Sequence, residues 1–120
     1  MPIVISILIA LVAFLHVYFM VLEMFLWNKP LGLKTFKQTQ AKADDSATLA
    51  ANQGLYNGFL AAGLAWSLIT SGPEAFAFKW FFLGCVVVAG GYGAATVSRR
   101  ILFIQAAPAA VALILLLVAR

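Results

Sequence analysis

Residues 3–27 read IVISILIALVAFLHVYFMVLEMFLW, an apolar run that is long enough to cross a lipid bilayer as a helix. Two ionisable side chains, His16 and Glu23, interrupt it. They are seven residues apart, close to two helical turns, so they share one helix face about 10 Å apart along the axis. An ionisable group is costly in lipid and needs a partner. We therefore expect this face to point into protein or water.

The rest of the chain repeats the same pattern. Of 120 residues, 64% are hydrophobic and 10% are charged. Apolar segments at 49–70, 75–97 and 101–119 follow the first one, and 28–48 is the only substantial loop. The pattern predicts an all-α polytopic membrane protein, a single domain over residues 1–120 with four antiparallel transmembrane helices in an up-down bundle. We interpret residues 3–27 as a retained helix, because no basic start or small-residue cleavage pattern marks a secretory signal.

The eight basic residues predict the orientation of the chain in the membrane. Six of them lie in two loops: Lys29, Lys34, Lys37, Lys42, Arg99 and Arg100. Only Lys79 and Arg120 lie on the other side. The positive-inside rule therefore places both loops in the cytoplasm and both termini outside it. Because the charge is divided among loops, it does not predict nucleic-acid binding. The expected location is a bacterial inner membrane.

Local signals refine the helix ends. Asp44, Asp45 and Ser46 are candidate N-caps for the second helix. Residues 31–36 mix apolar and basic side chains, which fits either an amphipathic turn at the lipid surface or a solvated linker. A tight hairpin is expected at Ser71–Glu74, with glycine after one helix and proline at the start of the next. Pro108 should disturb the fourth helix, because it cannot donate a hydrogen bond to Ile104.

Small residues indicate where helices meet. Ala50, Gly54, Gly58 and Ala62 recur every four residues, and several glycines and alanines gather over 90–95. Such stripes let helix backbones approach closely. Together with the small size of the bundle, they led us to expect a homo-oligomer. Cys85 is interpreted as a packing residue.

Polar side chains occur at one depth on all four predicted helices. At 1.5 Å per residue, most of them lie about 5 to 8 Å inside the cytoplasmic boundary. Unmatched polar groups in lipid would be costly, so we predict a polar pocket that binds a small ligand. Its candidate residues are Glu23, His16, Asn52, Gln53, Tyr56, Asn57, Tyr92 and Gln105. No metal site and no particular cofactor is predicted.

Motifs along the chain resemble a known family. They are His16-Val-Tyr18, the run Leu22–Trp27, the run Ala51–Gly58 (ANQGLYNG), the run Gly91–Thr96 (GYGAAT), and Gln105 before Pro108. Together they are similar to the bacterial family named domain of unknown function 1304, over nearly the whole chain. The resemblance implies a four-helix inner-membrane protein. It implies no activity.

Three functions fit the pattern. The first is binding or transport of a small ligand, coupled to a proton on Glu23, since burial disfavours a charged carboxylate and should let Glu23 exchange a proton near physiological pH. The second is an enzyme acting on a lipophilic substrate, with Glu23 or His16 as general base and Tyr92 or an amide as electrophilic support. The third is a structural or assembly role, in which the polar groups only hold helices together.

Overall fold

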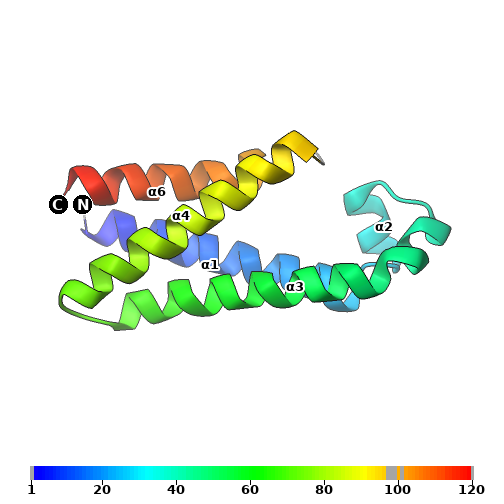
Figure 1. Cartoon of the computed structure of the whole chain (residues 1–120), viewed down its shortest axis with the longest axis horizontal. Helices are drawn as coiled ribbons and strands as arrows, with labels where there is room; N and C mark the ends of the chain where they lie inside the picture. Colours follow the sequence, from blue (N-terminus) through cyan, green and yellow to red (C-terminus); the bar gives the residue numbers. More distant parts are fainter. Residues whose placement is uncertain (1, 97–99, 101, 120) are drawn as a thin grey trace. The chain divides into compact units, whose positions relative to one another are not determined.

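The protein is almost entirely helical. The computed structural model describes residues 2–96, 100 and 102–119, and no strand occurs among them. The fold class predicted from the sequence, all-α, is therefore confirmed. The elements in chain order are α1 (Pro2–Phe25), α2 (Pro30–Phe36), α3 (Gln40–Ile69), α4 (Pro73–Thr96), the π-helix η1 (Leu102–Ala106) and α6 (Ala107–Val118) (Figure 1).

Contacts group these elements into two compact units. The core unit consists of Met1–Leu15 and Leu60–Arg120, and the polar unit consists of His16–Phe59. The polar unit therefore holds α2, the second part of α1 and the first two thirds of α3. Each unit is described by itself below. The sequence-based expectation of one domain stays a prediction.

Apolar side chains from four helical segments fill the centre of the core unit. In this unit α4 packs against both η1 and α6, as Figure 1 also shows. Gly90 is needed where α4 meets η1, because a Cβ atom added there would lie 2.4 Å from the Cβ of Ala106. This close approach confirms the predicted role of small residues at Gly90. The fully buried core residues are Ile9, Val12, Leu64, Leu83, Val86, Ala109 and Ala112.

The hairpin between α3 and α4 forms where the sequence predicts it. Gly72 adopts a φ of 81°, which an L side chain disfavours, and Pro73 begins α4. The carbonyl of Gly72 accepts a hydrogen bond from the Ala75 amide at 3.1 Å. The second expected link, at Ser98–Arg100, lies mostly outside the described residues, which exclude 97–99 and 101.

The segment 28–48, predicted as a loop, is mostly helical. It contains α2, and α3 begins at Gln40, not at Leu49. The hydroxyl of Thr39 accepts a hydrogen bond from the Lys42 amide at 3.2 Å, as an N-cap does. The expected N-cap at Asp44–Ser46 is therefore wrong. The apolar run begins near Leu49, but the alanine, lysine and glutamine residues that precede it also favour helix. The helix therefore starts several residues earlier than the apolar run.

Pro108 coincides with a change of helix type. The residues just before it form the π-helix η1, and the regular α-helix α6 starts at Ala107 with proline in its first turn. Proline is tolerated there because the first amides of a helix have no intrahelical acceptor. The predicted disturbance of the fourth helix is confirmed, and it takes the form of a π-turn.

Candidate functional site

Glu23 lies in the last turn of α1, two residues before Phe25, and is bound by two side chains of α3. The Nε2 group of Gln53 donates to Oε2 of Glu23, and the Nδ2 group of Asn57 donates to Oε1. Gln53 and Asn57 are four residues apart and therefore lie on one helix face. Glu23 is only 3% exposed. We name these three residues the carboxylate–amide cluster.

Glycine on α3 brings the two helices close enough for these short side chains to meet. A Cβ atom added at Gly54 would lie 2.7 Å from Cγ of Met24 and 3.0 Å from Cβ of Glu23. One turn further, a Cβ atom at Gly58 would lie 2.8 Å from Sδ of Met20. The predicted close approach at Gly54 and Gly58 is therefore confirmed within the polar unit.

A second polar contact joins α3 to Trp27, which lies two residues beyond the end of α1. The Nε1 group of Trp27 donates to Oγ of Ser46 at 3.0 Å, and the Ser46 hydroxyl donates to the Lys42 carbonyl at 2.7 Å. The Trp27 ring also lies 4.7 Å from the ring of Phe36 in α2, measured between centroids. Trp27 thus fixes α2 and α3 against the end of α1. The sequence analysis did not predict this hydrogen bond.

Asp44 completes the contacts at the end of α1. Its Oδ1 atom accepts hydrogen bonds from Asn28 at 3.1 Å and from Gln40 at 3.0 Å. Sequence separation along these contacts widens from 16 residues for Asn28–Asp44 to 30 for Glu23–Gln53. This widening is the signature of an antiparallel helix pair. The antiparallel pairing thus continues beyond Glu23 to Trp27 and Asn28.

The other predicted site residues of the polar unit are placed differently. His16 is fully buried, with its ring 5.6 Å from that of Phe19 in an edge-to-face arrangement. Tyr56 is 58% exposed and contacts Phe59 in the same manner. Asn52 is exposed, and its side chain forms no hydrogen bond with another residue among those the structure describes.

Tyr92 and Gln105 belong to the core unit. Tyr92, on α4, is 72% exposed, whereas Gln105 is buried within η1. The structure therefore brings together three of the eight predicted residues: Glu23, Gln53 and Asn57. The pocket that would join all eight stays a prediction.

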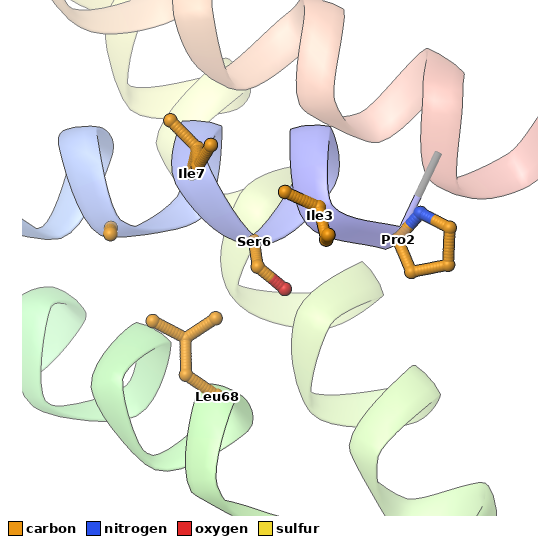
Figure 2. Close-up of a pocket in the computed structure, with 6 residues that line it drawn as sticks. Pro2, Ile3, Ser6, Ile7 and Leu68 are labelled. Carbon is orange, nitrogen blue, oxygen red and sulfur yellow. The ribbon is translucent and has the colours of Figure 1, made fainter.

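A shallow cavity that is open to the surface lies elsewhere, in the core unit. It has a volume of about 470 Å³ between the start of α1 and the end of α3 (Figure 2). Among the described residues that line it, Ser6 carries the one polar side-chain group, and none has an ionisable side chain. The sequence pattern did not identify this cavity, whose lining is chemically unlike the carboxylate–amide cluster. Its lining residues are Pro2, Ile3, Ser6, Ile7, Ala10 and Leu68.

The carboxylate–amide cluster combines one ionisable group with two neutral ones. Among the described residues, no three His, Cys, Asp or Glu side chains are grouped to hold a metal ion. Both partners of Glu23 are neutral amides. An amide can donate through its nitrogen or accept through its oxygen. The same two residues can therefore bind an ionised carboxylate, and one of them can rotate to accept from a protonated one.

Comparisons with known proteins point to one family. Residues 10–117 match the family model described as protein of unknown function (DUF1304). The chain is also 30% identical over 116 residues to the uncharacterized protein YpaA of Lactococcus lactis subsp. lactis (strain IL1403). The aligned region covers 95% of this chain and 94% of YpaA. No solved structure matches the chain. The match over nearly the full length shows that the chain belongs to the DUF1304 family.

Proposed function

We propose that this protein crosses a bacterial inner membrane four times and binds or transports a small ligand in a process coupled to a proton on Glu23. The observation that carries the proposal is the carboxylate–amide cluster: a buried carboxylate whose described partners are two neutral amides. A structural contact needs no ionisable group there, since glutamine would offer the same shape without the charge. Glutamate adds the ability to bind and release a proton.

The exposed apolar surface supports the membrane part of the proposal. Both α1 and α4 are long and apolar enough to cross a bilayer. In the most apolar 18-residue stretch of each helix, only 22% is buried. Large side chains such as Phe14 and Val88 are 68% and 72% exposed. In water this much apolar surface would drive association. Lipid is the solvent that suits it.

The two remaining spans of the proposal are α3 and the shorter apolar helix at Phe103–Val118. Helix α3 carries the polar side chains of the cluster, which lowers its hydropathy. All four lysines of 28–48 are exposed in the polar unit. Basic side chains of this kind favour the cytoplasmic side, which leaves both termini outside.

The amides explain how protonation would be linked to a ligand. When Glu23 is ionised, Gln53 and Asn57 both point N–H groups at it. On protonation one amide must turn its oxygen toward the carboxyl group, and its N–H group becomes available for another acceptor. A ligand that accepts this hydrogen bond would bind the protonated form more tightly. By linkage, such a ligand would promote uptake of one proton.

Counting protons tests this coupling. The purified protein in lipid nanodiscs is mixed with defined amino acids, polyamines, nucleosides and fatty acids, and binding is measured by calorimetry in buffers of different ionisation enthalpy. We expect a bound compound to be accompanied by proton uptake in the wild type and by none in the Glu23→Gln variant. Binding that is identical in both proteins, with no proton exchanged, would contradict the proposal.

One observation favours a second function, a purely structural one. Both oxygens of Glu23 are already bonded, and α3 approaches its Cβ atom closely at Gly54. In this alternative the carboxylate–amide cluster only holds α1 against α3. It predicts that Glu23→Gln keeps the thermal stability of the wild type and changes no other property of the protein.

A further inference from the structure

An exposed face of α3 lies beside the carboxylate–amide cluster. Leu49, Asn52, Tyr56 and Phe59 are spaced by three, four and three residues, so they form one stripe along the helix. Leu49, Tyr56 and Phe59 are 75%, 58% and 55% exposed, and Asn52 is exposed as well. We name these four residues the Asn52 face.

Asn52 differs from the other amides of this helix. Gln53 and Asn57 bind Glu23, whereas the side chain of Asn52 forms no hydrogen bond within the part of the chain that the structure describes. In the proposed membrane orientation Asn52 is at the depth of Glu23, inside the hydrocarbon boundary. An amide that finds no partner there costs several kcal/mol. Something must therefore pair with it.

We propose that a second copy of this chain covers the Asn52 face, with the two Asn52 amides hydrogen-bonded to each other across a two-fold axis. A carboxamide is self-complementary, because each one can donate through nitrogen and accept through oxygen. Symmetric contacts of this kind are the usual interface of homodimers. Polar side chains also hold helices together in membranes.

Depth in the membrane favours a second copy over other partners. Insertion fixes the depth of each residue, so a partner must offer a polar group at the level of Asn52. A copy inserted in the same orientation does so with its own Asn52. The rings of Tyr56 and Phe59 stand in edge-to-face contact 5.6 Å apart on the same face, and they supply apolar surface beside the amide pair.

This inference rests on the proposed insertion into the membrane, but not on the proton chemistry of Glu23. Its test therefore begins with the wild-type chain in bacterial membranes, where resistance to alkaline carbonate extraction shows insertion. If the chain is extracted, the membrane proposal and the dimer are both overturned. If it is retained, the result of the dimer measurement bears on the Asn52 face alone.

Dimerisation is measured by energy transfer between labelled full-length chains in liposomes as lipid is added. An amide hydrogen bond between helices changes the equilibrium constant of their association about tenfold. We expect Asn52→Leu to raise the dissociation constant of the dimer about tenfold or more. The control is Thr35→Leu, a polar-to-leucine change at an exposed position of α2, which should leave the constant unchanged. A monomeric wild type, or an Asn52→Leu variant that dimerises like the wild type, would overturn the proposal.

Cysteine cross-linking gives a second readout that does not need a destabilising change. In a Cys85→Ser background, Asn52→Cys should form a disulfide between copies on oxidation, because equivalent residues at a two-fold axis lie within disulfide reach. Leu11→Cys, exposed on α1, should not. No cross-link at position 52, or equal cross-linking at position 11, would show that another protein, lipid or water covers this face instead.

Discussion

The contact between Glu23 and Asn57 leads to a quantitative prediction. Replacing Asn57 with alanine removes the only group that donates to Oε1 of Glu23 among the described residues. Glu23 is 3% exposed, so its Oε1 atom has little access to water while the present packing is kept. A buried carboxylate oxygen without a partner is strongly destabilising.

The size of the effect depends on the charge of Glu23. A hydrogen bond to a charged group contributes about 1.5 to 3 kcal/mol, and one between neutral groups about 0.5 to 1.5 kcal/mol. The coupling energy between positions 23 and 57 should therefore be about 1.5 to 3 kcal/mol in alkaline solution, where Glu23 is ionised. It should fall by about half when acidification protonates the carboxyl group. The coupling energy falls on acidification because an amide forms a stronger hydrogen bond with an anion than with a neutral carboxyl group.

A double-mutant cycle isolates this coupling from other effects of each substitution. Unfolding free energies are measured in mixed micelles for the wild type, Glu23→Ala, Asn57→Ala and the double variant. The control cycle pairs Glu23→Ala with Asn52→Ala, which replaces an amide on the same helix that does not contact Glu23. Its coupling should be near zero. A Glu23–Asn57 coupling equal to that of the control, or one that is independent of pH, would show that Asn57 does not stabilise an ionised Glu23.

Three further predictions concern stability, measured as unfolding free energy. Gly54→Val should cost about 1 to 3 kcal/mol, because even a Cβ atom there lies 2.7 Å from Cγ of Met24, whereas Gly91→Ala should cost nothing, since a Cβ atom there has no neighbour within 4 Å; equal effects would contradict the close helix approach. Trp27→Phe should lower the unfolding free energy by about 1 kcal/mol, because it removes the hydrogen bond from Trp27 to Ser46. An unchanged unfolding free energy would show that this bond does not stabilise the protein. Gly72→Ala should be destabilising because of its positive φ, and a gain in stability would contradict the turn geometry.

Much of the helical layout follows from the sequence because single features have strong local effects. An apolar run predicts α1 and α4 by length alone, and Gly72 with Pro73 marks a turn that few other residues allow. Pro108 likewise marks the end of η1. The start of α3 at Gln40 is not predicted, because hydropathy reports where lipid contact would end and not where backbone hydrogen bonding ends.

The candidate site is predicted less completely. Comparison of depths brings Glu23 to the level of Gln53, and the structure places these side chains in contact. Depth does not specify the direction around the helix axis, however. Asn52 lies next to Gln53 in sequence but about 100° away on the helix, and it faces outward. Contacts that depend on this angle, such as that of Trp27 with Ser46, required the structure.

The most direct test of the central claim is the protonation state of Glu23 itself. Infrared difference spectra of the protein in lipid bilayers, recorded during a pH titration, report the carbonyl band of a protonated carboxyl group. We expect a band that appears as the pH falls through the neutral range and is absent from the Glu23→Gln variant. A Glu23 that stays ionised throughout that range would contradict the account and leave the carboxylate–amide cluster as a structural contact.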